Sequence, residues 1–209
     1  IAKSLGIADW DAAQLIGGWS RAVRMNFDAG VALGPWGKRH FVEGVGMGLF
    51  TEAMPWITHR QCILQPPSAG DRIADALHQL REHLHGTKAS PLNVILDGRD
   101  ISDNYIMLEA MNTHYVGPNL FLAPDVEHGD GLLHVVGVTE GDRELLDACL
   151  GEWKFGSTWP ADLGVHTGKR LEIEWTGFPV HIDDLPWQAE GDAPAGSRDS
   201  IILTIERAA

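Results

Sequence analysis

Two adjacent carboxylates, Asp183 and Asp184, follow Val180-His181-Ile182 at the end of an expected strand. A carboxylate held at the end of a strand can accept a proton from a substrate hydroxyl, which makes the pair a candidate general base. An ordinary acidic turn before Pro186 explains the same residues. Taken alone, the turn is the better interpretation.

A second acidic stretch at residues 123–131 contains Asp125, Glu127 and Asp130 and precedes an apolar strand. The oxygens of such a loop could hold a hard cation such as Mg²⁺. An Asp-Gly turn that leads into the strand explains the same residues, and taken alone it is again the better interpretation.

Glycines alternate at Gly44, Gly46 and Gly48, after one expected strand and before a helix that could begin at Leu49. A phosphate-binding loop has this placement, but it also needs a Lys-Ser/Thr pair or a third glycine at dinucleotide spacing, and both are missing here. A tight, closely packed strand-to-helix turn is therefore the better interpretation. The ten histidines show no helical i, i+4 ligand pair beside a carboxylate, so we expect solvated or structural histidines.

The elements that must position these groups are mainly strands. Apolar patterning predicts strands at residues 23–33, 40–45, 92–96, 105–111, 132–138, 170–175, 179–182 and 200–205. Helices are expected at residues 8–21, 66–85 (with Ser68 as the N-cap) and 142–150, and turns at 34–37 and 97–98. Strands and helices do not alternate regularly, which predicts a mainly β protein with helices (α+β). We expect a two-layer antiparallel β-sandwich with peripheral helices.

Composition narrows the function. The 209 residues include 16 basic and 29 acidic side chains, a net charge of −13, which argues against a nucleic-acid partner and against electrostatic docking on anionic membranes. The two cysteines, Cys62 and Cys149, form no disulfide or metal-binding pattern, and Cys149 is expected to be buried. There is no apolar run of about 20 residues and no signal peptide, so a cytoplasmic protein without a transmembrane segment is expected. The first residue, Ile1, suggests a fragment or a processed product.

Taken together, the motifs resemble the bacterial diacylglycerol kinase and sphingosine kinase-like family. Residues 1–7 look like the segment after the family's GTxNN/GTxND motif, and residues 41–48 look like its strand and glycine turn after the domain crossover. The most specific similarity is to the pattern N…GG…laP…DGlldv, matched by Asn112, Gly117-Pro118, residues 122–124 and residues 130–133. Residues 180–183 resemble the v-x-h-DGE strand. The similarity runs over most of the chain.

The resemblance implies a division of the chain and a role for it. Residues 1–22 would be a remnant of the nucleotide-binding domain or an interdomain helix, and residues 23–209 the C-terminal β-sandwich domain that contacts the lipid. The parent would transfer the γ-phosphate of ATP, with Mg²⁺, to a lipid alcohol that is expected to be diacylglycerol. The GGDGT nucleotide loop is missing, so the isolated chain is expected to be inactive.

The resemblance also assigns site residues. Asp183 matches the DGE aspartate, the base toward the lipid hydroxyl, while Asp184 and Leu185 replace the glycine and the glutamate. Because of that departure, Asp184 and the reversed motif at Glu190 and Asp192 remain alternatives to Asp183. Two further groups are assigned, namely a metal site of Asp130 with backbone oxygens of Glu127 and Leu132, and a lipid cleft at Gly46, Met47, Asn112 and Gly117.

The expected partners are the lipid alcohol and the chain's own N-terminal nucleotide-binding domain, at a peripheral position on the inner membrane face. The sequence leaves the oligomeric state open, a homodimer included. Two other interpretations also stay open: a lipid-binding module that has lost catalysis, which the altered DGE motif motivates, and a β-sandwich that binds a protein partner.

Overall fold

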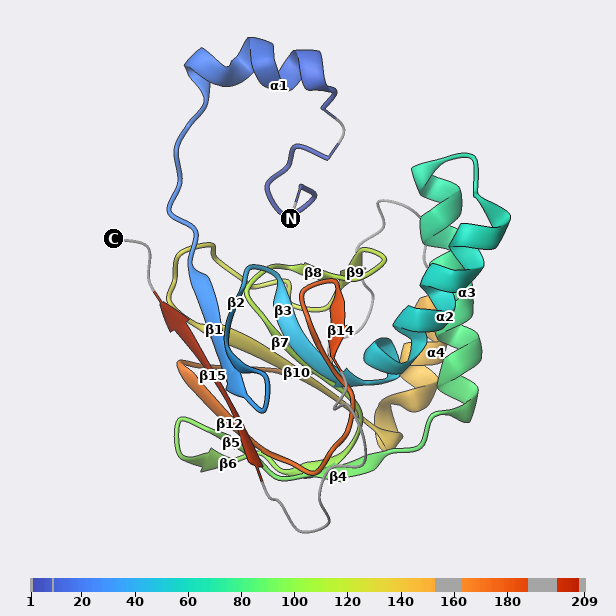
Figure 1. Ribbon diagram of the computed structural model, residues 1–209, viewed down its shortest axis with the longest axis vertical. Helices are drawn as coiled ribbons and strands as arrows, with labels where there is room; N and C mark the ends of the chain where they lie inside the picture. The colour runs from blue at the N-terminus through green and yellow to red at the C-terminus, as the bar shows by residue number, and fades with distance from the viewer. Residues whose placement is uncertain (1, 9, 153–162, 188–198, 207–209) are drawn as a thin grey trace.

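Two antiparallel β-sheets pack face to face, and three helices cover one of them in a computed structural model that describes residues 2–8, 10–152, 163–187 and 199–206 (Figure 1). Every strand pair in this part of the chain is antiparallel. The α+β sandwich predicted from the sequence is therefore confirmed.

The first sheet, called sheet A, contains both the first and the last strands of the sequence. Its six strands run in the order β2-β1-β15-β12-β5-β6. Their bounds are β1 (Ala29–Gly34), β2 (Gly37–Phe41), β5 (Val94–Leu96), β6 (Arg99–Asp100), β12 (Arg170–Trp175) and β15 (Asp199–Glu206). Strand β15, the last in the sequence, lies between β1 and β12 and pairs with both.

The second sheet, called sheet B, carries the residues of the candidate site. Its strands run in the order β11-β10-β7-β3-β13-β14, and β4 also pairs with β7. Their bounds are β3 (Gly44–Gly48), β4 (Ser90–Leu92), β7 (Asp103–Met111), β10 (Leu133–Thr139), β11 (Val165–Gly168), β13 (Val180–Ile182) and β14 (Leu185–Trp187). A separate ribbon of β8 (Tyr115–Val116) and β9 (Leu120–Phe121) follows β7.

Sheet B is buried on both faces, and alternation along its strands divides the side chains between two cores. Leu108 and Ala110 point into the core between the sheets, together with Phe41 and Trp175 from the side of sheet A. Met107 and Met111 point to the opposite face, where they pack under the helices. From Met107 to Met111, the odd positions of β7 therefore face the helices and the even positions face sheet A.

The helical layer consists of α2 (Leu49–Leu64), α3 (Ala69–Gly86) and α4 (Arg143–Glu152), which lie together on one side of the sandwich (Figure 1). Helix α3 has the predicted amphipathic face, and Ser68 caps it by accepting a hydrogen bond from the Asp71 amide. Helix α2 extends far beyond the start expected at Leu49. None of the helices that the described residues form combines the length and hydropathy of a transmembrane span.

The N-terminal helix α1 (Ala12–Gly18), continued by a 3₁₀ turn (Trp19–Arg21), stands away from both sheets (Figure 1). It has no buried residue. The division of the chain into residues 1–22 and 23–209 stays a prediction.

Other local predictions are confirmed, except for the start of one strand. Asp97 and Gly98 form the hairpin turn between β5 and β6, both with positive φ. Cys149 is buried and Cys62 exposed, and neither is in a disulfide. The strand expected at residues 23–33 is shorter and begins only at Ala29.

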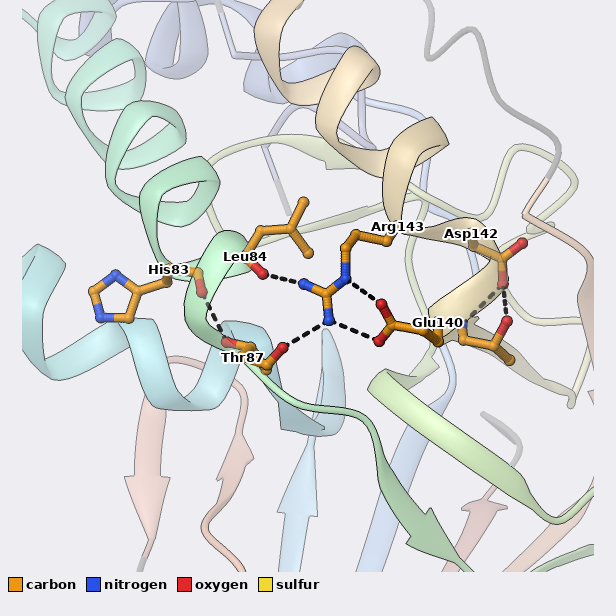
Figure 2. A network of polar contacts seen from close by, with 7 residues as sticks. His83, Leu84, Thr87, Glu140, Asp142 and Arg143 are labelled. Atoms are coloured by element: carbon orange, nitrogen blue, oxygen red, sulfur yellow. Dashed lines mark hydrogen bonds and ion pairs between the residues drawn. The ribbon is translucent and has the colours of Figure 1, made fainter.

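Arg143, the first residue of α4, links this helix to the end of α3 (Figure 2). Its guanidinium donates hydrogen bonds to the carbonyl oxygens of Leu84 and Thr87 at the end of α3. It also forms an ion pair with Glu140, 2.6 Å from Nε to Oε1. Since the last carbonyls of a helix have no partner within the helix, Arg143 satisfies groups that α3 itself cannot.

We expect Arg143→Ala to lower the free energy of unfolding by about 1–3 kcal/mol, because hydrogen bonds from a charged donor to backbone acceptors are lost. Urea denaturation measures this loss. Arg39→Ala is the control, because Arg39 is an exposed arginine of β2. An equal loss in both variants would contradict the bracing role of Arg143.

Candidate functional site

A groove of about 450 Å³ opens between α2 and α3 and reaches the end of sheet B. Its lining is mainly apolar and comes from four segments: α2, α3, the link between β8 and β9, and the turn between β13 and β14. The lining residues are Phe50, Met54, Ile57, Thr58, Gln61, Ala69, Arg72, Ile73, Ala76, Gly117, Pro118 and Asp184. Clefts of this size with a mostly apolar wall and few polar groups are typical of small-molecule sites.

The acidic residues 183 and 184 form the two-residue turn of the β13–β14 hairpin, because Ile182 pairs with Leu185. Asp183 has a φ of 50°, in the left-handed region that aspartate and asparagine tolerate better than most residues. The turn lies at the end of the groove, and Asp184 is the member of the pair that lines it.

The Asp183 carboxylate is turned back onto the link between β2 and β3. Its oxygens accept hydrogen bonds from the backbone amides of Val42 (3.1 Å), Glu43 (2.8 Å) and Gly44 (3.2 Å). Successive amides arranged in this way form a concave site for an anion. Asp183 also donates its own amide hydrogen to the Gly44 carbonyl, 2.9 Å away.

Asn112 also holds the link between β2 and β3. Its side-chain amide donates to the carbonyl oxygens of Val42, 3.0 Å away, and Asp28, 2.8 Å away. Asn112, assigned to the lipid cleft by the resemblance, thus fastens the segment to which Asp183 binds. It is not among the residues that line the groove.

A buried ion pair lies behind the turn, on the helix-facing side of sheet B. Glu109 of β7, Gly46 of β3 and His181 of β13 are in register across neighbouring strands. Both charged side chains are completely buried, and His181 Nε2 lies 3.0 Å from Glu109 Oε2. The carboxylate fills the space above Gly46, where a Cβ atom would overlap it.

Hydrogen bonding fixes the charge of His181. Its Nδ1 lies 2.9 Å from the Asp183 carbonyl, and its Nε2 faces the Glu109 carboxylate. The Asp183 carbonyl and an ionised Glu109 carboxylate are both acceptors, an arrangement that suits the imidazolium ion, in which both ring nitrogens carry hydrogen. Burial by itself lowers the pKa of His181, but the Glu109 carboxylate and the Asp183 carbonyl reverse this effect and raise the pKa above its usual value.

The ion pair is also linked to the wall of the groove. The Phe50 ring stands edge-on to the His181 ring, with 5.0 Å between centroids. On its other side Phe50 fills the space where a Cβ atom of Gly117 would lie. Thr51, the next residue of α2, donates a hydrogen bond to the Gly46 carbonyl at 3.0 Å and so anchors the start of α2 on β3.

The residues predicted for the lipid cleft thus occupy different positions. Gly117 lines the groove, whereas Gly46 does not and instead leaves the space that the Glu109 carboxylate occupies. Met47 points into the core between the sheets. Phe50, Met54 and Ile57 form the α2 wall instead.

The predicted metal residues share one tight loop before β10. The Glu127 carbonyl accepts a hydrogen bond from the Asp130 amide, and Asp130 Oδ1 accepts one from the Leu132 amide at 2.8 Å. Positive φ angles at Gly129 and Gly131 allow this shape. The loop therefore brings Asp130 close to the backbone of both predicted co-ligands.

The donor set of this loop suits a hard cation only in part. Asp130 Oδ2 lies 3.0 Å from His134 Nε2, although an ionised carboxylate oxygen can serve a second partner. Within the described ranges no group of three or more His, Cys, Asp or Glu side chains is arranged to hold a metal. Mg²⁺ here would depend on one carboxylate, backbone oxygens and water, which is compatible with its habit of keeping several waters.

Asp28 is a carboxylate at this loop that the sequence did not single out. It is 2% exposed and accepts a hydrogen bond from the Gly131 amide at 2.6 Å. Glu109 and His181 were likewise missed as a pair, because the residues are far apart in sequence. The alternative residues Glu190 and Asp192 lie outside the described residues.

We expect Gly46→Ala to destabilise the protein by about 3–5 kcal/mol, because the added methyl group displaces Glu109 and leaves a buried charge without its partner. Chemical denaturation measures the effect. Gly86→Ala is the matched control, because a Cβ atom at Gly86 meets no heavy atom within 4 Å. A loss below about 1 kcal/mol for Gly46→Ala would contradict the steric role of this glycine.

The raised pKa of His181 predicts a pH dependence. A histidine that binds its proton more tightly in the folded state stabilises the protein fully below its unfolded pKa of about 6.5, and this stabilisation is lost as the pH rises through the folded pKa. Glu109→Gln removes the anion that raises the pKa. We therefore expect the stability difference between wild type and variant to be largest below about pH 6.5 and to shrink as the pH rises above that value in urea titrations. A difference that does not change with pH would contradict a charged pair.

The sequence matches no model of a protein family, and a search of curated proteins finds no match. Solved structures do resemble the chain. Two structures of a proposed diacylglycerol kinase from Bacillus anthracis str. Sterne superpose with TM-scores of 0.57 and 0.62 at 18% and 19% identity. A structure from the same organism described as a diacylglycerol kinase gives 0.56 at 20% identity.

These likenesses cover 97–99% of the chain but only 60–61% of the solved chains. The chain thus spans about three fifths of the length of the structures it resembles. At this level of identity the likeness concerns the fold, and it extends over nearly the whole chain. The protein has the fold of the corresponding part of these diacylglycerol kinase structures.

Proposed function

We propose that this chain is the C-terminal, substrate-side part of an ATP-dependent lipid kinase whose acceptor is a lipid alcohol such as diacylglycerol. The observation that carries the proposal is the apolar groove between α2 and α3, which ends at an acidic turn. The shared fold supports it. An acyl chain needs an apolar wall, and the hydroxyl at its head needs a carboxylate nearby.

The chain's own residues would perform two tasks. Phe50, Met54 and Ile57 on α2 and Ile73 on α3 would exclude water around the acyl chain and orient the lipid along the groove. The turn at residues 183–184 would supply the carboxylate that accepts the hydroxyl proton as the oxygen attacks phosphorus. Phosphoryl transfer depends mainly on such positioning and on charge neutralisation.

The remaining parts of the reaction centre would come from elsewhere. ATP would bind mostly to an N-terminal nucleotide-binding domain, the expected partner of this chain. Mg²⁺ would be held by Asp130 with backbone oxygens of Glu127 and Leu132, where it would stabilise the loop before β10 and add positive charge near the site. The isolated chain would be inactive, and the complete enzyme would act on lipid at the inner face of the membrane.

A second candidate function is lipid binding without catalysis. The family's DGE glutamate is replaced by Leu185, which is exposed on β14. The loss of that carboxylate favours a member that keeps the groove and binds lipid but does not turn over.

The test is a Mg²⁺-dependent phosphate-transfer assay on the full-length protein, with ATP and a panel of lipid alcohols, beside the 209-residue chain. Activity in the full-length protein and none in the chain is the expected result, and the panel identifies the acceptor. Lipid binding without any transfer would support the second candidate.

Filling the groove provides a more specific test. Ala69 is an exposed alanine that lines the groove, whereas Ala74 is an exposed alanine of the same helix that does not. We expect Ala69→Trp to weaken binding of a short-chain diacylglycerol at least about tenfold by steric exclusion, while Ala74→Trp binds normally. Equal affinity in the two variants would show that lipid does not occupy this groove.

A further inference from the structure

We infer that Asp184 is the carboxylate that receives the substrate hydroxyl, and that Asp183, His181 and Glu109 are positioning residues that hold it there. This inference rests on the proposed function and departs from the assignment implied by the resemblance, in which Asp183 is the base. It follows from how the structure uses each of the two adjacent acids.

Asp183 is committed to the fold. Its carboxylate accepts hydrogen bonds from the amides of Val42, Glu43 and Gly44. Asp183 is not among the residues that line the groove. These hydrogen bonds hold the carboxylate in place against the backbone of residues 42–44. To reach a substrate, Asp183 would have to abandon these amides.

Asp184 has the complementary properties. It is exposed, lines the groove together with Phe50 and Gly117, and makes no hydrogen bond or ion pair with any described residue. It is therefore available to accept a hydrogen bond from an incoming hydroxyl. A candidate base is judged first by its geometric access to the proton, and Asp184 has that access.

Asp184 is held in position through the residue before it, because both the carbonyl and the carboxylate of Asp183 are hydrogen-bonded. His181 Nδ1 donates to the Asp183 carbonyl at 2.9 Å, and this carbonyl belongs to the peptide bond that leads into Asp184. Glu109, completely buried above Gly46, keeps His181 protonated and oriented. The Asp183 carboxylate fixes the turn against residues 42–44. The turn is thus held at both its backbone and its side chain.

The transfer step balances with Asp184 as the base. The lipid O–H bond breaks and its proton passes to the Asp184 carboxylate, while the oxygen forms a bond to the γ-phosphorus of ATP. The bond between that phosphorus and the β–γ bridging oxygen breaks, and ADP leaves. The proton then returns to solvent from Asp184, which is exposed.

The first experiment uses the 209-residue chain and needs no nucleotide. It compares binding of dihexanoylglycerol with binding of the dihexanoyl ester of 1,2-propanediol, which lacks only the hydroxyl group. We expect wild type to prefer the alcohol by about tenfold, because a hydrogen bond to a charged acceptor is lost with the diester. Asp184→Asn should reduce this preference strongly, and Asp183→Asn should reduce it less.

The matched variants keep the experiment interpretable. Asparagine tolerates positive φ and keeps one acceptor oxygen, so Asp183→Asn should fold with a lower melting temperature, while Asp184→Asn should melt like wild type. If the preference is lost in Asp183→Asn and kept in Asp184→Asn, the inference is overturned while the groove survives. If wild type binds both lipids equally well, Asp184 does not contact the hydroxyl. If it binds neither, the proposed function fails.

The second experiment measures turnover by the full-length protein and its variants. Asp184→Asn should lower kcat about 10²–10⁴-fold with little change in KM, the usual contribution of a positioned general base. The acid limb of its pH–rate profile should disappear at the same time. His181→Gln should lower kcat less and keep that limb, because the base is misplaced but present. An acid limb that vanishes in Asp183→Asn instead would return the role to Asp183.

Discussion

The candidate site depends on the buried ion pair between Glu109 and His181. This pair can form only because the strand between them, β3, has a glycine at the position where the two side chains meet. Glu109 and His181 belong to strands that are not neighbours, and β3 runs between them. Gly46 leaves the space through which the carboxylate reaches the imidazole. Such a pair is costly to desolvate, so its value lies in the geometry it imposes. Here it orients the carbonyl that leads into the acidic turn.

The surrounding structure makes this arrangement rigid. Sheet B is covered on one face by sheet A and on the other by the helices, so its strands cannot shift without disturbing two cores. Helix α2 begins directly at the end of β3 and presents Phe50 both to His181 and to the groove. The polar pair and the apolar wall are therefore parts of one packed unit. A site on rigid elements can hold a reacting group more accurately than one on a free loop.

Much of the fold was predictable from local pattern, and the exceptions have physical causes. Helix α3 has a clear amphipathic stripe and an N-cap serine, and it was found at almost its true length. Helix α2 was missed beyond its first residue, because it contains Pro55 and buries side chains only near its start, which leaves no periodic stripe. Strand β14 is exposed and contains Pro186, so it carries little strand signal. In the site, Gly117 and the acidic turn were found, whereas Phe50, Asp28 and Glu109 were not.

The sequence by itself determined the strand-rich α+β class, the order of the motifs and the two acidic stretches, because these depend on residue type and short-range spacing. It could not decide which of two adjacent carboxylates lines the groove. That choice depends on the direction of the β13–β14 turn and on the amides of residues 42–44, about 140 residues earlier in the chain. Only the tertiary structure brings these segments together, and it directs Asp183 into the fold and leaves Asp184 at the groove.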